Sequence, residues 1–191
     1  MRRKTLDRLL SAAGLVVAAV LLIAGGMLVW AHSYVHNQVR DQLSAQQIFF
    51  PANGSDALKS PDIGPYLNQY AGQQLVNGKQ AEAYANHFIA VHLKEMAGGQ
   101  TYAQLSGKSL ANPNDAQLAG QVQTMFRGET LRGLLLNAYA FDTMATVALI
   151  GGIVAFIGGG LMIVLSVLGL IHARQIADTE PAPPTRQEVT V

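Results

Sequence analysis

The sequence contains two long runs without a formally charged residue, residues 9–39 and 143–173. Charged residues make up about a quarter of an average soluble domain, but only 13% of this 191-residue chain. The missing charges are concentrated in these two runs rather than spread along the chain. This distribution argues against a soluble globule with one core and predicts two segments that cross a membrane.

The most apolar parts of the runs, residues 9–31 and 143–171, are predicted to be transmembrane helices. At 1.5 Å per residue the first reaches roughly 34 Å, which is enough for a hydrocarbon layer about 30 Å thick. The second exceeds this requirement, so we expect it to tilt or to extend beyond the bilayer. Both should be helical, because a backbone in lipid must satisfy its hydrogen bonds internally.

The charges at the start of the chain predict its orientation. Residues 1–8 hold three Arg and one Lys against one Asp, and the positive-inside rule places such a segment in the cytoplasm. Two spans then return residues 172–191 to the cytoplasm and leave residues 32–142 on the extracytoplasmic side. We expect residues 172–191, which are polar and rich in proline, to be a disordered tail. Binding of a cytoplasmic partner by this tail is the alternative.

A cleavable signal peptide is the alternative to a first membrane anchor. The basic start fits such a peptide, and Val29 and Ala31 are small residues where a peptidase would cut. However, the apolar stretch is longer than the 7–15 residues that are typical of a signal peptide. The length therefore favours an uncleaved anchor.

Residues 32–142 are predicted to form a mostly helical cap, so the fold class is an all-α membrane protein with two transmembrane helices flanking that cap. The first helix should continue the first span and end before Pro51, because a residue preceding proline is disfavoured in a helix. Residues 52–65 are turn-rich and should form a loop. Apolar residues at helical spacing predict the other helices, over 66–75, 78–97, 115–125 and 131–141.

The helix predicted over 78–97 should end at the pair Gly98 and Gly99. Its apolar residues recur at helical spacing, which predicts the face that it buries. That face consists of Ala81, Ala85, Phe88, His92 and Met96.

Small residues recur at intervals of four within both predicted spans. They let helix backbones approach closely in a membrane. Two interpretations stay open: packing of the two spans against each other, and association with a second copy or with a partner's span. The positions are Gly14, Ala18 and Gly26 in the first span and Gly151, Ala155 and Gly159 in the second.

His32 and His36 are four residues apart, so their side chains share one helix face just outside the first span. A metal site needs at least a third ligand, and Asp142, at the corresponding end of the second span, is the candidate. The alternative is a pair of interfacial histidines without a metal. Because the sequence offers no other set, and no catalytic nucleophile motif, we predict no cofactor and no enzyme activity.

The segment QQIFFP places Ile48, Phe49 and Phe50 in succession. An exposed cluster of this kind would mark a partner site, and the alternative is that the three side chains cover the core of the cap. A net charge of +1 without a basic stripe argues against nucleic acid as a partner. The chain has no Cys, which excludes thiol catalysis and Cys-ligated clusters.

Three segments carry a resemblance to a known family: the opening MRRKTLDRLLSAAGLVVAAVLLIAGG, the segment QQIFFPANG and the segment MFRGETLRGLLLNAYAF. Over nearly its whole length the chain resembles small two-span membrane proteins of high-GC Gram-positive bacteria. The resemblance implies a bacterial plasma-membrane protein. Members are often described as aromatic ring-opening dioxygenases, but a non-haem iron site of that type needs two His and a carboxylate with open positions.

The sequence therefore favours a non-enzymatic integral membrane protein. Its partners would be the lipid bilayer and either another membrane protein or a second copy, in an accessory or scaffold role in the cell envelope. The alternative is an extracytoplasmic ligand-sensing module that signals through a separate partner. A pocket with convergent polar groups in the cap would favour that alternative.

Overall fold

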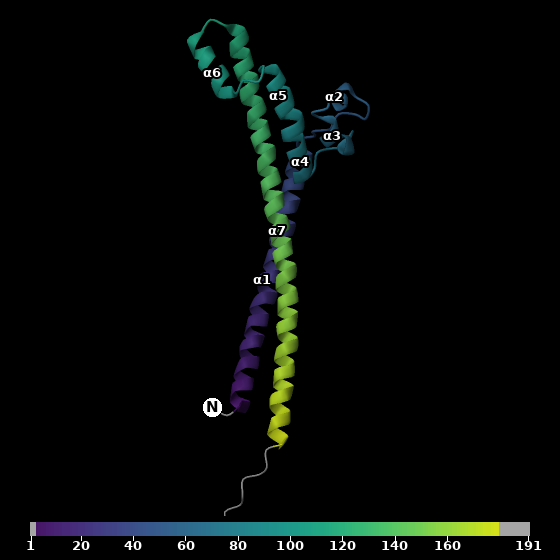
Figure 1. Cartoon of the computed structure of the whole chain (residues 1–191), viewed down its shortest axis with the longest axis vertical. Helices are drawn as coiled ribbons and strands as arrows, with labels where there is room; N and C mark the ends of the chain where they lie inside the picture. Colours follow the sequence, from purple (N-terminus) through teal and green to yellow (C-terminus); the bar gives the residue numbers. More distant parts are fainter. Residues whose placement is uncertain (1–2, 180–191) are drawn as a thin grey trace, which may run out of the picture. The chain divides into compact units, whose positions relative to one another are not determined.

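The structure is a computed structural model and describes residues 3–179. It is all-helical over these residues, without a strand, as predicted. The two longest helices, α1 (Arg3–Ala45) and α7 (Ala116–Thr179), contain the two predicted spans (Figure 1). Within the predicted disordered tail, α7 continues as helix through Thr179, and residues 180–191 lie outside the described part.

The chain divides into two units, and both α1 and α7 contribute to each of them. The first, here called the apolar unit, comprises the described residues of 1–30 and 149–191. The second, here called the polar unit, comprises residues 31–148.

In the apolar unit, α1 and α7 approach each other closely at small residues. A Cβ added at Gly152 would lie 3.1 Å from the carbonyl oxygen of Gly25, and one added at Gly14 would overlap the hydroxyl of Ser166. Both helices are long and apolar enough to cross a membrane. Only 17% of the most apolar stretch of α1 and 11% of that of α7 is buried within the protein, whereas the core helix of a soluble protein is mostly buried.

The polar unit is built around one apolar core to which every described helix of the unit except the short η1 contributes buried side chains. Leu67 and Leu75 are fully buried at its centre. Phe50 packs edge-on against Tyr84, with ring centroids 5.4 Å apart, and burial raises the pKa of the Tyr84 phenol. The shorter elements are α2 (Asp56–Lys59), α3 (Gly64–Leu67), η1 (Asn68–Tyr70), α4 (Gly78–Tyr84), η2 (Ala85–Ile89), α5 (Ala90–Met96) and α6 (Tyr102–Ala111).

Polar side chains cap the starts of α4, α6 and α7. Asn77 caps α4 by accepting a hydrogen bond from the backbone N–H of Gln80. Asp115 accepts one from the N–H of Leu118 at the start of α7, at 2.9 Å, which agrees with the predicted start. The helix α6 was not predicted, although Thr101 begins a capping box with Gln104. Figure 1 shows α6 turning back beside the first turns of α7.

The first helix ends before Pro51, as predicted, but it ends several residues earlier than the proline requires. The helix α1 ends at Ala45, and Gln47 adopts a left-handed φ of 50°, a conformation that terminates helices. The next residues are extended and pair with residues 72–75: the N–H of Phe50 donates to the carbonyl of Gln73, and that of Leu75 donates to Ile48. Branched and aromatic residues favour this extended backbone. The predicted loop over 52–65 is wrong in part, because it contains α2 and the start of α3.

The helix predicted over 78–97 is present, but a π-helical segment, η2, interrupts it. Ala81 and Ala85 are buried as expected, whereas His92 is exposed, and the buried face continues through Ile89 and Leu93. A strict four-residue spacing drifts by about 40° per step around a regular α-helix. The wider π turn compensates part of this drift, so the buried face keeps the four-residue spacing through Ile89 and Leu93. The predicted face, which steps by three residues from Ala85 to Phe88, was therefore wrong from Phe88 onward.

We predict that Gly64→Ala destabilises the polar unit by about 1–3 kcal/mol, because the added Cβ would overlap the backbone carbonyl oxygen of Leu58. The matched control is Gly107→Ala in α6, where a Cβ meets no atom within 4 Å. There alanine should stabilise by about 0.5–1 kcal/mol. Thermal unfolding of the full chain in detergent measures both changes. Equal effects of the two substitutions would contradict the packing described here.

Candidate functional site

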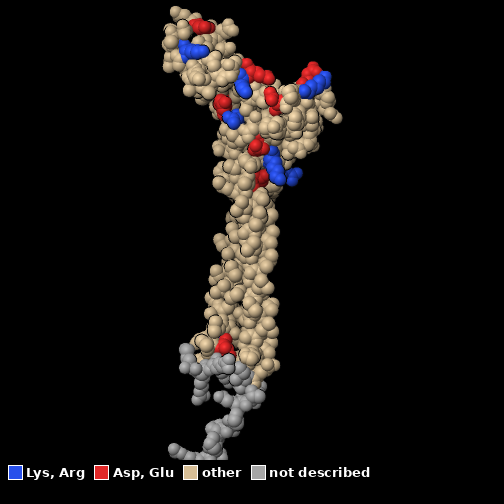
Figure 2. Space-filling view, viewed as in Figure 1, with Lys and Arg blue, Asp and Glu red and all other residues tan. Residues whose placement is uncertain are grey.

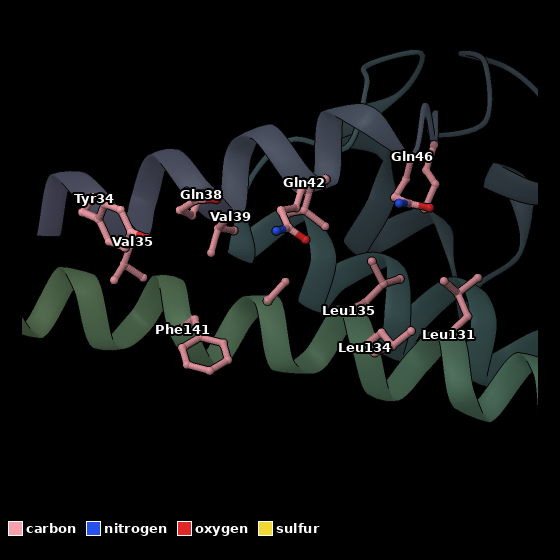
Figure 3. Close-up of a pocket in the computed structure, with 13 residues that line it drawn as sticks. Tyr34, Val35, Gln38, Val39, Gln42, Gln46, Leu131, Leu134, Leu135 and Phe141 are labelled. Carbon is pink, nitrogen blue, oxygen red and sulfur yellow. The ribbon is translucent and has the colours of Figure 1, made fainter. Parts of the chain in front are cut away.

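An elongated groove of about 490 Å³ lies between α1 and α7 in the polar unit (Figure 3). None of its lining residues is charged. From α1 and the segment after it these are Tyr34, Val35, Gln38, Val39, Gln42, Leu43, Gln46 and Ile48, and from α7 they are Leu131, Leu134, Leu135, Ala138 and Phe141.

Each helix contributes a distinct chemistry to the groove. The α1 wall carries Gln38 and Gln42, and Gln46 follows directly after the helix end, so that the three glutamines form one stripe at intervals of four residues. The α7 wall is apolar, and Leu134 and Phe141 are 61% and 57% exposed. Figure 3 shows the glutamines extending from α1 and the leucines and Phe141 from α7. The groove is therefore an apolar surface with amide groups along one wall.

The floor of the groove belongs to the core. Val39, Leu43 and Leu135 line it and are also members of the buried cluster. The same cluster contains Ile89 of η2 and Leu93 of α5. These helices therefore cover one side of the α1–α7 pair, and the groove is its other side.

The structure brings His32, His36 and Asp142 together in the polar unit. The Nδ1–H of His36 donates to Asp142 Oδ1 at 2.7 Å, and His32 Nδ1–H donates to the carbonyl oxygen of Ala145 at 2.9 Å. The two imidazole rings stack with centroids 5.6 Å apart. Asp142, whose side chain is only 14% exposed, also accepts a hydrogen bond from the backbone N–H of Gly78 at 3.0 Å.

These contacts make Asp142 a link between α1, α4 and α7. Its two carboxylate oxygens accept hydrogen bonds from His36 and Gly78, so it fixes the orientation of the His36 ring. Among residues 3–179 no group of three His, Cys, Asp or Glu side chains is arranged to hold a metal ion. The arrangement supports a structural contact between the three helices.

The other histidines of the polar unit are engaged elsewhere. His87 stacks on Tyr66 with ring centroids 3.5 Å apart, and His92 Nδ1–H donates to the carbonyl oxygen of Phe88 at 2.7 Å. A second hollow of about 630 Å³ beside His87 contains both acidic and basic residues, including Asp62 and Lys94. Charged residues of both signs are scattered over the visible face of the polar unit in Figure 2.

The three residues of the candidate aromatic patch have different environments. Phe50 is buried in the core at 3% exposure, whereas Phe49 is 57% exposed. Ile48 is half-buried and lines the groove. A continuous patch of the three is therefore not present, and the exposed apolar surface lies mainly on α7.

The small residues of the two predicted spans differ in their contacts within the apolar unit. A Cβ at Gly159 would lie 3.4 Å from the Ala18 carbonyl oxygen, and one at Gly151 would lie 3.5 Å from Leu28. A Cβ at Gly26 would meet no atom within 4 Å, because Gly25 is the residue next to α7. Ala155 is half-buried.

Sequence reasoning did not identify the groove. The spacing of Leu131, Leu134 and Phe141 indicated an apolar helix face, but periodicity alone does not tell whether such a face is covered. The glutamine stripe is detectable as a four-residue repeat in α1. The pairing of α1 with α7, which converts two faces into one groove, depends on contacts between residues about 100 positions apart.

No family model, curated protein or solved structure matches the chain. The resemblance to two-span proteins of high-GC Gram-positive bacteria therefore stays a prediction. The candidate site rests on its geometry alone.

We predict that Asp142→Ala destabilises the polar unit by about 1.5–3 kcal/mol, because it leaves two buried or half-buried donors without their acceptor. Asp142→Asn should cost less, since the amide oxygen still accepts one bond. The control is Glu129→Gln, which removes an exposed ion pair with Arg132 and should change stability by less than about 1 kcal/mol. Thermal unfolding of the full chain measures all three. A rise of the wild-type midpoint with added Zn²⁺, absent in His32→Ala, would instead indicate a metal site.

Proposed function

We propose that the chain is a non-enzymatic two-span membrane protein that acts as an accessory or scaffold subunit through protein contacts of its polar unit. The observation that supports this is the groove, whose exposed Leu134 and Phe141 lie on a surface without charged residues. Exposed apolar surface of this kind is typical of interaction sites. In this proposal residues 32–142 lie on the extracytoplasmic side of a bacterial plasma membrane.

Two features of the apolar unit support the membrane part of the proposal. Its helices expose long apolar side chains, for example Ile23 at 66% and Leu165 at 62%. Exposure of apolar residues along both helices is unfavourable in water and favourable in lipid. The four basic residues among residues 1–8 support an orientation with both termini in the cytoplasm.

The alternative function, sensing of a small ligand, is favoured by the volume and chemistry of the same groove. A cavity of about 490 Å³ is within the range of ligand sites. Its amide groups along an otherwise apolar wall are the combination that such sites use to orient a ligand. A sensor would hold a small molecule that survives purification, and native mass spectrometry of the full chain would detect it.

The orientation can be tested with single cysteines, since the chain contains none. A membrane-impermeant maleimide added to intact cells should label Ala103→Cys, an exposed position in α6. It should not label Thr5→Cys until the membrane is permeabilised. The reverse pattern of labelling would contradict the proposed orientation, and recovery of the chain without detergent would contradict the membrane assignment.

The proposed interaction role predicts that an exposed leucine in the groove is required for complex formation, whereas an exposed leucine outside the groove is not. Leu134→Asp, in the groove, should abolish a stable stoichiometric complex isolated from native membranes in mild detergent, because it places a charge in an apolar contact. Leu110→Asp, at a position on α6 that is 81% exposed, should leave the complex intact. Mass spectrometry with quantification of the bound protein measures both. Absence of any stable protein complex, including one with a second copy, would contradict the proposal.

A further inference from the structure

The groove between α1 and α7 in the polar unit is open on the side away from α4, η2 and α5. We propose that a second copy of the chain covers it, so that two α1–α7 pairs form a four-helix bundle around a two-fold axis parallel to the helices. This inference rests on the proposed function, since it names the protein that occupies the interaction surface.

The chemistry of the groove is suited to pairing with itself. In a two-fold interface each surface patch meets its own copy, so a charged residue near the axis would face an identical charge. The groove contains no charged residue, although residues 32–142 carry seven Lys or Arg and eight Asp or Glu. A glutamine amide is both a donor and an acceptor, and Gln38 and Gln42 can therefore pair with the same residues of a second copy.

The spacing of the groove residues is that of a helix bundle. Leu131, Leu134, Ala138 and Phe141 follow one another at intervals of three, four and three, which is the seam spacing of supercoiled helices. A pair of helices leaves such a seam open on one side, and a bundle of four encloses it. Glutamines within the enclosed seam would select the register of the two copies, as single polar core residues do in coiled coils.

A common orientation in the membrane makes this pairing geometrically possible. The basic N-terminus gives every copy the same orientation, so two copies meet with their helices at equal heights. His36 and Asp142 lie at one height, as their hydrogen bond of 2.7 Å shows. Gln42 lies six residues further along α1, which places it near the height of Leu134 on the antiparallel α7. Because the proposed two-fold axis places α1 of one copy opposite α7 of the other, Gln42 of one copy lies close to Leu134 of the partner subunit.

Crosslinking between two single-cysteine variants tests this contact. Two differently tagged full-length chains, one with Gln42→Cys and one with Leu134→Cys, are co-expressed, and native membranes are treated with a short bismaleimide. Both positions are exposed, so the substitutions leave the core intact. A crosslinked dimer carrying both tags is expected. The control replaces Gln42→Cys by Arg40→Cys, which is also exposed but lies about 200° around α1, and should give no such dimer.

A second measurement is the dimer dissociation constant of the full chain in lipid bilayers. Leu134→Lys should raise it at least about tenfold, because each copy then brings a charge to the shared seam. Leu110→Lys should leave it unchanged. The inference is overturned if the wild-type chain is monomeric, if Arg40→Cys crosslinks as well as Gln42→Cys, or if a different protein or a lipid occupies the groove. Binding of a different protein at Leu134 would overturn the dimer but still support the proposed function. Failure to label Ala103→Cys in intact cells would overturn the proposed topology, whatever the outcome for the dimer.

Discussion

The contact between α1 and α7 in the polar unit is the interaction on which the rest of that unit depends. Val39, Leu43 and Leu135 form this contact and are buried because both helices supply apolar residues at the same height. On one side of the contact the shorter helices complete a core. On the other side the same residues form the floor of an uncharged groove. Stability and the candidate interaction surface therefore depend on the same side chains.

Polar contacts complement this apolar seam. Asp142 holds α1 and α4 against α7 through His36 and through the first backbone N–H of α4. Because the Asp142 carboxylate accepts both hydrogen bonds, neither the His36 ring N–H nor the Gly78 backbone N–H is left without an acceptor. The contact also explains why residue 78 is glycine: an added Cβ would lie 2.6 Å from the Cβ and 2.8 Å from the Oδ2 of Asp142.

Much of the helical architecture was predictable from local sequence signals. Apolar periodicity predicted the two long helices and the helix after Asn77, and the glycine pair at 98–99 and Asp115 predicted an end and a start. The extended segment after α1 was not predicted, because nonlocal contacts determine its backbone, whereas α6 was missed although a local signal for it exists. Residues 48–51 pair with a segment more than 20 residues away, and a four-residue search for a capping box would have identified α6. For the candidate site, proximity of His36 to Asp142 followed from the antiparallel course of the two helices, but the groove did not, because its walls are distant in sequence.

The π-helical segment η2 has a consequence for how this unit can change during evolution. It contains one residue more per turn than an α-helix would, and the extra residue keeps Leu93 pointed at Gly128 of α7, where no side chain intervenes. Deleting a single residue between 85 and 89 would restore regular α-helical winding and rotate α5 by about 100° about its axis. Leu93 would then no longer pack against Gly128 of α7, and a side chain at position 128 would no longer overlap Leu93. The number of residues in this short stretch is therefore constrained by packing, as are its buried residues Ala85 and Ile89.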